Sequence, residues 1–336
     1  MTGPGDVLDD TVPTVSVVVP TFNRRDQLHR TLLGLAEQRL PGHRFETIVI
    51  SDGSTDGTTE YLLGGETPLP VVALAQENSG PAAARNRGVE AARGDLIVFV
   101  DDDIVPAPGL IAAHLSAHET LGGELISIGP MLTPPDGGLS PWVSWEQRML
   151  EKQYDMVRSG VLEISARQFY TANAAVRRRH LIAAGGFDET FRRAEDVELA
   201  YRLADRGLTF AFVEEAVGYH YAERSYASWR TNAYVYGRND IIFGRDRGQS
   251  WMFALIKDQF DSRHPIVRAL THIGVPRPRL HRAIDRMLSS VAGVARRARL
   301  DAVEQYALSA IYNLAYYEGV AVELGSGERL KELLGI

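Results

Sequence analysis

The sequence predicts an α/β fold, with a mostly parallel sheet flanked by helices and a mainly helical C-terminal region. Three observations support this prediction. Short β-branched runs alternate with segments of helical periodicity over the first hundred residues, as in right-handed βαβ units. Polar residues directly follow three of these runs. Beyond about residue 225 the strand pattern is replaced by helical periodicity.

The composition is that of an ordinary globular protein, with 336 residues, 45% of them hydrophobic and 24% charged. A formal charge of −7 argues against nucleic-acid binding. The absence of cysteine excludes disulfides and cysteine–zinc sites. Residues 1–13 are polar and acidic, unlike a signal peptide, and we expect them to form a disordered tail. No apolar run reaches about 18 residues, so no spanning helix and a cytoplasmic location are expected.

Apolar runs and periodicity place the elements in chain order. Each apolar run reads as a strand buried on both faces, and each helix ends at a glycine or a polar turn. The predicted strands are 15–19, 45–50, 71–75, 96–100, 169–176 and 208–213. The predicted helices are 26–38, 58–63, 80–92, 142–157, 178–184, 195–206 and about 302–323, and 130–140 is a loop. We assign 14–222 to one domain and 223–336 to a helical region.

Polar residues lie at the carboxyl ends of three predicted parallel strands, namely 21–24, 51–54 and 101–103. Open sheets of this type bind ligands beyond those ends. The third group is Asp101-Asp102-Asp103, whose adjacent carboxylates repel one another and favour a bound cation. In extended chain Asp101 and Asp103 would point to one side and Asp102 to the other. The alternative is a solvated acidic turn.

Four stretches together resemble the inverting family 2 glycosyltransferases, which have a GT-A fold. They are VSVVVPTFNR, ETIVISDGSTDGT, NSGPAAARNRGVEAARGDLIVFVDDD and RRAEDVELAYRL, within residues 14–220. The resemblance implies a nucleotide-sugar donor, with a UDP-sugar as the first expectation, and Mn²⁺ or Mg²⁺ as cofactor. It makes Asp103 the direct metal ligand and Asp101 a ribose or water-bridged metal neighbour. The residues that it assigns to nucleotide-sugar binding are Pro20, Thr21, Arg24, Asp52, Arg85, Asp101 and Asp102. For Asp52 the alternative is a turn former, and for Arg85 a solvated charge.

Inverting sugar transfer needs a base that removes the proton of the acceptor hydroxyl. Glu195 and Asp196 resemble the acidic pair of the family and fall in the first turn of a predicted helix. The helix dipole there favours the ionised form of a carboxylate. Acidic residues are also common in first turns without any catalytic role. Adjacent residues point about 100° apart, so we predict Asp196 as the base and Glu195 as the runner-up or acceptor-orienting residue.

The resemblance also suggests a second metal ligand and acceptor contacts. A family histidine completes the metal site at about the position of His220, and imidazole suits Mn²⁺. The alternative is a structural histidine. Asn173 could touch donor or acceptor hydroxyls. Of Trp142 and Trp145, one is expected in the core and the other against an acceptor, and the sequence does not distinguish them.

The C-terminal third departs from the family pattern. Residues 263–299 contain many arginines and one acidic residue, Asp285. A helical stripe runs between the arginines, formed by Ile284, Met287, Leu288, Val291 and Val294. Such a helix could lie on an anionic membrane, at the inner face in a cytoplasmic protein. Alternatively it packs on its own domain or a second subunit, and the final helix could support a homodimer.

Two rival functions remain at this stage. A sugar nucleotidyltransferase also uses metal-binding aspartates, but a Gly-rich phosphate loop is absent after the first strand. A non-catalytic nucleotide-sugar-binding or membrane scaffold protein would not need the predicted base. We therefore expect a glycosyltransferase whose acceptor is a polysaccharide or a lipid-linked glycan. The sugar, the nucleotide, the linkage and the oligomeric state cannot be inferred from the sequence.

Overall fold

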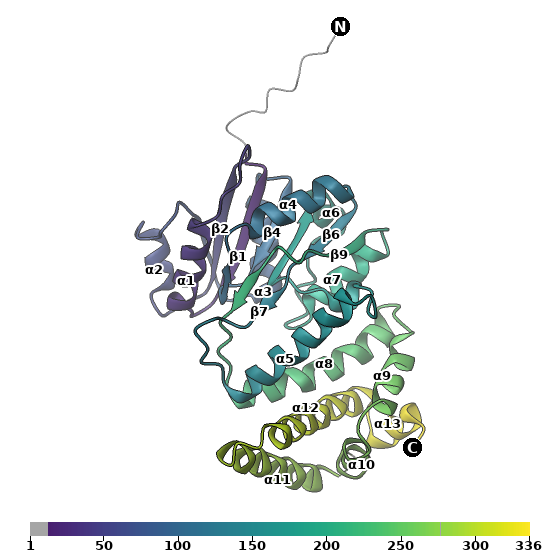
Figure 1. Ribbon diagram of the computed structural model, residues 1–336. Helices are drawn as coiled ribbons and strands as arrows, with labels where there is room; N and C mark the ends of the chain where they lie inside the picture. The colour runs from purple at the N-terminus through teal and green to yellow at the C-terminus, as the bar shows by residue number, and fades with distance from the viewer. Residues whose placement is uncertain (1–12, 276) are drawn as a thin grey trace. The chain divides into compact units, whose positions relative to one another are not determined.

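The computed structural model describes residues 13–275 and 277–336, so residues 1–12 of the predicted tail lie outside the described residues. The chain forms two compact units (Figure 1). Unit 1 holds the chain up to Gly138 together with Leu150–Ala222, and unit 2 holds Leu139–Met149 and Glu223–Ile336. The division falls at the predicted 222/223 boundary, but residues 139–149 group with the later unit rather than with 14–222.

Unit 1 is built on a seven-stranded sheet in the order β3-β2-β1-β4-β8-β6-β9. The first four strands are parallel, and β8 runs antiparallel between β4 and β6. The predicted fold class is therefore confirmed, with one reversed strand. The strands are β1 (Val15–Thr21), β2 (Phe45–Asp52), β3 (Val72–Gln76), β4 (Leu96–Val100), β6 (Leu125–Ile128), β8 (Asn173–Arg177) and β9 (Thr209–Phe212).

Helices cover both faces of this sheet because its central strands are apolar on both sides. Val17 and Val19 share one buried cluster with Leu28 and Leu32 of α1, whereas Val18 lies on the opposite face under α3. Each such side chain contributes roughly 1.5–3 kcal/mol by burial. The helices of unit 1 are α1 (Arg25–Ala36), α2 (Thr58–Leu63), α3 (Pro81–Ala91), α4 (Leu110–Leu121), α6 (Arg178–Ala183) and α7 (Glu195–Ala204), and α5 (Pro141–Arg158) begins in unit 2.

A second, three-stranded sheet is the part of unit 1 that the sequence patterns did not indicate. It consists of β5 (Ile104–Pro106), β10 (Gly218–His220) and β7 (Met131–Leu132) in the order β5-β10-β7. Its strands have two or three residues, too few for an alternating pattern. Its register pairs His220 with Ile104. The sheet thereby joins the segment that follows the aspartates to a segment more than a hundred residues later.

Other differences from the predicted elements also have local causes. The predicted strand 169–176 is shorter, because a 3-10 turn at Ala166–Gln168 precedes it and β8 begins only at Asn173. Ser165 and Gln168 form a reciprocal capping box at that turn. Helix α4 and strand β6 were not predicted.

Unit 2 is helical, as predicted for the C-terminal region. Helices α8 and α12 form its central pair, and α11 packs beside α12 (Figure 1). Within residues 13–275 and 277–336, no helix has the length and apolar character that a membrane span requires. The helices are α8 (Tyr226–Asp246), α9 (Met252–Asp261), α10 (Pro265–Gly274), α11 (Pro278–Arg297), α12 (Asp301–Leu324) and α13 (Gly327–Leu334).

Two glycines allow α8 and α12 to cross closely. A Cβ atom on Gly319 of α12 would lie 1.9 Å from the carbonyl oxygen of Tyr234 in α8. A Cβ atom on Gly237 of α8 would lie 2.0 Å from the carbonyl oxygen of Tyr316 in α12. Because neither backbone oxygen can rotate away, any side chain at these positions forces the helices apart.

We expect Gly319→Ala to lower the free energy of unfolding by about 1–3 kcal/mol, because the added methyl group overpacks this crossing. Urea unfolding followed by far-UV circular dichroism measures the change. Gly293→Ala is the matched control, since Gly293 lies in α11 with open space where a Cβ atom would be. Alanine there should be neutral or slightly stabilising through helix propensity. Equal effects of the two substitutions would contradict the close crossing.

Candidate active site

The three aspartates lie at the carboxyl edge of the parallel strands, as predicted, but they do not continue the strand. The chain turns after β4, and Ile104 N donates to the carbonyl oxygen of Asp101 at 3.1 Å. The prediction that Asp101 and Asp103 share one side is therefore wrong, because it assumed extended backbone. Asp102 and Asp103 instead share a partner, and Asp101 has a different one.

Arg24, just beyond β1, holds the first pair of carboxylates. Its Nη1 lies 2.9 Å from Asp102 Oδ1 and 2.9 Å from Asp103 Oδ2. Burial raises the pKa of Asp102 to about 7, against the opposing charge of Arg24 and with the help of Asp103. Arg24 was predicted to line the nucleotide pocket, and the structure places it directly on the aspartates.

Asp103 also meets His220, as the resemblance implied. The short second sheet brings His220 Nε2 to 3.7 Å from Asp103 Oδ1. A carboxylate and an imidazole suit a divalent ion such as Mn²⁺. No cluster of three or more metal-ligating side chains occurs within the described part of the chain. Two side chains alone would leave most coordination positions of a divalent ion to water and substrate phosphates.

Arg85 of α3 joins Asp101 to Glu195, the neighbour of the predicted base. Its Nη2 lies 2.7 Å from Asp101 Oδ1 and its Nη1 lies 2.7 Å from Glu195 Oε1. Burial works against the charge of Arg85, but the carboxylates of Asp101 and Glu195 outweigh it and raise its pKa. Arg85 is 5% exposed, so it is neither the solvated charge of the alternative interpretation nor an open contact for a nucleotide.

This ion pair distinguishes the two acids in the first turn of α7. Glu195 is held by Arg85, whereas Asp196 Oδ1 accepts from Val197 N at 2.8 Å. Burial and the charge of Glu195 raise the pKa of Asp196 to about 7, although Arg85 opposes this. Loss of hydration and the neighbouring carboxylate therefore act on Asp196 in the direction opposite to the helix dipole, which favours the ionised form.

Asp52 lies at the end of β2 with both of its carboxylate oxygens engaged. Oδ1 accepts from Gln76 Nε2 and Ser79 N, and Oδ2 accepts from Gly80 N, all at 2.8–2.9 Å. These contacts fasten the loop that leads into α3. Asp52 is only 4% exposed, so the structure shows it as a support for this loop and not as an open contact for a nucleotide base.

The other predicted pocket residues, Pro20 and Thr21, are the last two residues of β1, and a loop follows them. Thr21 is buried at the end of β1, and Pro20 is partly exposed. Asn23 connects this loop to the one after β2, since its N–H donates to Ser54 Oγ and its side chain accepts from Thr55 N. Asn23 was not among the predicted site residues. Its φ of 53° is a left-handed conformation that asparagine tolerates better than most residues.

Asn173 does not line an open surface, contrary to its predicted acceptor contact. Its side chain has no exposed area, and its Nδ2 donates to the carbonyl oxygens of Pro130 and Ala216. Its Oδ1 pairs with His114 Nε2 at 3.0 Å. Asn173 therefore braces the main sheet against the loops that lead into β7 and β10.

The structure separates the two tryptophans. Trp145 is buried in unit 2, with ring centroids 4.9 Å from Tyr312 and 5.7 Å from Trp229. Trp142 is partly exposed, and its Nε1 donates to the carbonyl oxygen of Arg224 at 2.7 Å. Trp145 is thus the core residue. Trp142 is the one of the two that stays a candidate for the predicted acceptor contact.

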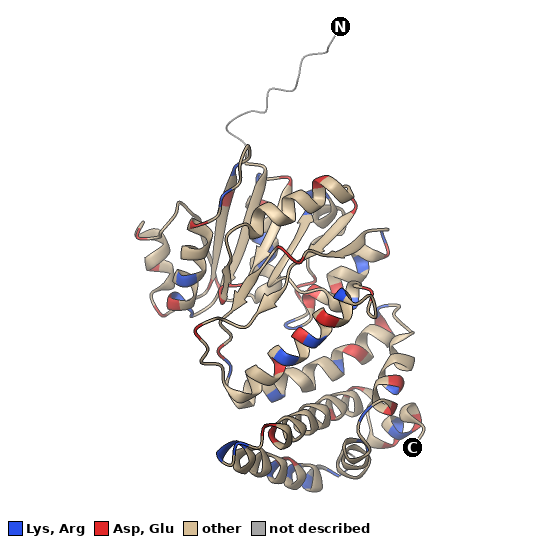
Figure 2. Cartoon of the chain, viewed as in Figure 1, with Lys and Arg blue, Asp and Glu red and all other residues tan. Residues whose placement is uncertain are grey.

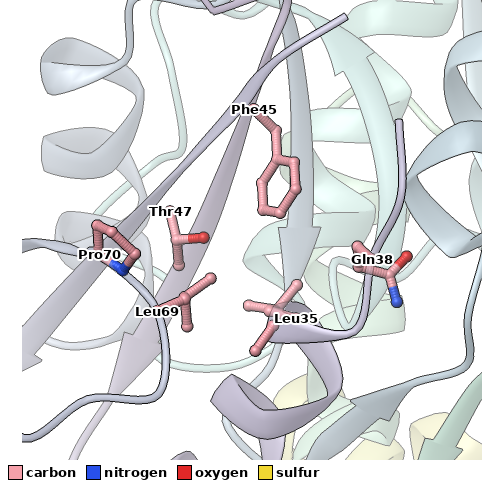
Figure 3. Close-up of a pocket in the computed structure, with 7 residues that line it drawn as sticks. Leu35, Gln38, Phe45, Thr47, Leu69 and Pro70 are labelled. Carbon is pink, nitrogen blue, oxygen red and sulfur yellow. The ribbon is translucent and has the colours of Figure 1, made fainter. Parts of the chain in front are cut away.

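Figure 3 shows an apolar pocket elsewhere in unit 1, between the end of α1, strand β2 and the segment that precedes β3. None of the predicted site residues lines it. Its lining consists of Leu35, Ala36, Gln38, Phe45, Thr47, Leu69 and Pro70. The site is therefore defined by charged groups at the sheet edge and not by this pocket.

With this fold and site described, the chain is identified as a member of glycosyl transferase family 2, whose model matches residues 16–184. Validoxylamine A glucosyltransferase of Streptomyces hygroscopicus subsp. limoneus is 32% identical over 236 residues, covering 62% of this chain and 51% of that protein. The uncharacterized glycosyltransferase YfnE of Bacillus subtilis is 28% identical over 253 residues, covering 61% and 64%. The chain thus spans about half to two thirds of the length of these relatives.

Solved structures show the same fold. The mannosyltransferase PcManGT from Pyrobaculum calidifontis, in complex with GDP-Man and Mn²⁺, superposes with a TM-score of 0.57 at 20% identity, covering 90% of this chain and 86% of that one. S. aureus TarS 1-349 in complex with UDP-GlcNAc gives a TM-score of 0.55 at 16% identity, covering 93% and 92%. Both the predicted family and the predicted GT-A fold are confirmed.

Two buried histidines beneath the site make stability depend on pH. His114 Nδ1 lies 2.8 Å and His118 Nε2 3.2 Å from Ser127 Oγ. Burial lowers the pKa of His114 from 6.5 to about 4. Burial and then the charge of His114 lower the pKa of His118 from 6.5 to about 4.

We expect the free energy of unfolding to fall as pH falls from about 6.5 towards 4, because only the unfolded chain takes up these protons in that range. The effect is of order 3 kcal/mol per histidine. The raised pKa values of Asp102 and Asp196 make the free energy of unfolding change with pH in the opposite direction. The test therefore compares the parent with a variant that lacks both histidines. Urea unfolding at pH 7 and pH 5 should show a smaller loss in His114→Gln/His118→Gln than in the parent. Equal losses would contradict the buried neutral pair.

Proposed function

We propose that the chain is an inverting, metal-dependent glycosyltransferase that moves a sugar from a nucleotide-sugar donor to an acceptor hydroxyl. One observation carries the proposal: Arg85 ties Glu195 to Asp101, so that the neighbour of the candidate base Asp196 and the first of the three aspartates belong to one charged cluster. Family membership favours this reaction over nucleotidyl transfer.

Asp196 is the proposed general base. Its pKa of about 7 suits a group that must be ionised before reaction and must accept a proton during it. Glu195 acts as a positioning residue, because its carboxylate is held by Arg85 at 2.7 Å. Attack by the acceptor hydroxyl opposite the leaving diphosphate would invert the anomeric configuration and give a β-linkage from an α-linked donor.

Asp103 and His220 are the proposed metal ligands, and Asp101 is the proposed ribose or water-bridged neighbour. A bound Mn²⁺ or Mg²⁺ would supply positive charge to neutralise the leaving diphosphate. Arg24, at 2.9 Å from both Asp102 and Asp103, keeps these carboxylates compensated without a metal. Thr21 and Asp52, each no more than 4% exposed, would support the loops around the nucleotide rather than contact it directly.

The donor that we propose first is a UDP-sugar, and the acceptor is a polysaccharide or a lipid-linked glycan. The solved neighbours include one complex with GDP-Man and one with UDP-GlcNAc, so both nucleotides belong in the test. Of the predicted acceptor contacts we retain Trp142, whose ring is partly exposed.

Replacing Asp196 by Asn should reduce the transfer rate about 100-fold or more while donor affinity stays unchanged, because an amide cannot accept the proton. In the parent protein, kcat/KM should fall as pH falls through about 7, since protonation removes the base. Asp205→Asn makes the same chemical change at the exposed C-terminal end of α7 and should leave the rate unchanged. A fully active Asp196→Asn enzyme would assign the base elsewhere.

Titration calorimetry with UDP-, GDP- and dTDP-sugars, with and without Mn²⁺, should show metal-dependent binding of one nucleotide class. His220→Ala should weaken that binding about tenfold or more, because it removes one of two protein ligands. His272→Ala is the control, since His272 is an exposed histidine of unit 2. Identical binding with and without metal would remove the metal from the proposal.

A further inference from the structure

Helix α11 in unit 2 has three distinct faces. The first is apolar and buried, and it packs where α11 runs beside α12. Its residues are spaced so that they form one stripe of a helix. They are Ile284, Leu288, Ala292 and Ala295, each no more than 8% exposed. This face confirms that part of the predicted stripe packs on the chain's own core.

The second face is apolar and exposed to solvent. Leu280, Met287, Val291 and Val294 recur at intervals of seven, four and three residues, which places them on one side of the helix. Met287 is 52% exposed and Val294 is 62% exposed. The predicted stripe of five residues is therefore split, with two residues buried and three exposed to solvent.

The third face is basic and adjoins the second. Arg279, Arg286 and Arg297 are all exposed and lie within about 100° of the exposed apolar stripe around the helix axis. From Arg277 to Arg299 the sequence has seven arginines and one acidic residue, Asp285, which is ion-paired with Arg230 of α8 at 3.1 Å. Figure 2 shows this concentration of basic residues along α11.

The exposed apolar surface continues past the end of α11. The turn into α12 has Arg299 in a left-handed conformation with φ of 55°. Beyond it, Leu300 is 52% exposed, Val303 is 44% exposed and Tyr306 is 68% exposed. Exposed apolar side chains beside arginines thus extend from one helix into the next.

We propose that the α11 docking face, formed by Leu280, Met287, Val291 and Val294 with Arg279, Arg286 and Arg297, binds the surface of an anionic lipid bilayer. In such binding, the exposed apolar side chains of a helix enter the boundary between lipid headgroups and acyl chains. The neighbouring arginines pair with lipid phosphates. The basic composition of α11 is the opposite of the chain's net charge of −7, so the positive charge is a local feature.

Charge decides between this partner and a second copy of the chain. A twofold dimer contact through the same face would oppose the arginines of one copy to those of the other. An anionic bilayer complements both the basic and the apolar stripes. Nucleic acid would match the arginines but would leave the four apolar side chains without partners. The inference stands independently of the proposed sugar transfer, and it would keep the chain where lipid-linked acceptors are located.

Co-sedimentation of the full chain with vesicles tests the proposal. We expect binding to vesicles of equal parts phosphatidylglycerol and phosphatidylcholine, and little binding to phosphatidylcholine alone. Raising the salt concentration to about 0.5 M should weaken the binding, because the electrostatic part is screened at roughly 4 Å in such a solution. Failure of the folded chain to bind the anionic vesicles would overturn the proposal.

Two triple variants distinguish the contribution of α11 to vesicle binding from the effect of the chain's overall charge. Arg279→Gln/Arg286→Gln/Arg297→Gln should reduce the partition onto anionic vesicles by about fivefold per arginine, or roughly 100-fold together. The control is a triple variant with the same loss of charge at exposed arginines of unit 1. It consists of Arg39→Gln, Arg44→Gln and Arg206→Gln. An equal loss of binding in this control would overturn the assignment to α11.

The apolar stripe has its own matched pair of variants. Val291→Ser/Val294→Ser should weaken binding about tenfold or more, because burial of these side chains in the headgroup boundary is lost. Leu121→Ser/Ile182→Ser, at exposed apolar sites of unit 1, should not weaken it. Light scattering gives the oligomeric state of each protein. If the parent is a dimer that does not bind vesicles, and Val291→Ser/Val294→Ser converts it to a monomer, the partner is a second copy and the proposal is overturned.

Discussion

Repulsion among carboxylates at one edge of the sheet is the constraint on which the site depends. Asp101, Asp102 and Asp103 leave β4 at the point where the first turn of α7 contributes Glu195 and Asp196. Two arginines compensate this charge: Arg24 spans one pair of aspartates, and Arg85 joins Asp101 to Glu195. Because charged groups withdrawn from water are stable only when paired, these contacts hold four separate chain segments together.

The same pairing divides the acids into different chemical roles. Glu195 is engaged by Arg85, and its charge together with burial raises the pKa of the neighbouring Asp196. Asp103 lies between Arg24 and His220, the latter positioned by the register of the small second sheet. A single arginine on α3 thus connects Asp101 with Glu195, the neighbour of the proposed base.

Unit 2 illustrates how one helix can satisfy two environments. The close crossing of α8 and α12, allowed by Gly237 and Gly319, makes α12 a firm surface for the buried face of α11. The remaining faces of α11 carry exposed valines and arginines together. Periodicity marked the helix as amphipathic, but it could not show which of two adjacent apolar stripes was covered, because both have helical spacing.

The sequence by itself determined the alternation of strands and helices, the polar strand ends and the family, because apolar periodicity and contiguous motifs are local properties of the chain. It also placed Asp103 with His220 and singled out Asp196, in each case through the resemblance. The tertiary structure alone decided the partners of Arg24 and Arg85, the burial of Asn173 and the choice of Trp145 for the core. Each of those depends on residues tens of positions apart, or on a backbone turn such as the one after Val100, and such contacts leave no periodic signal in the sequence.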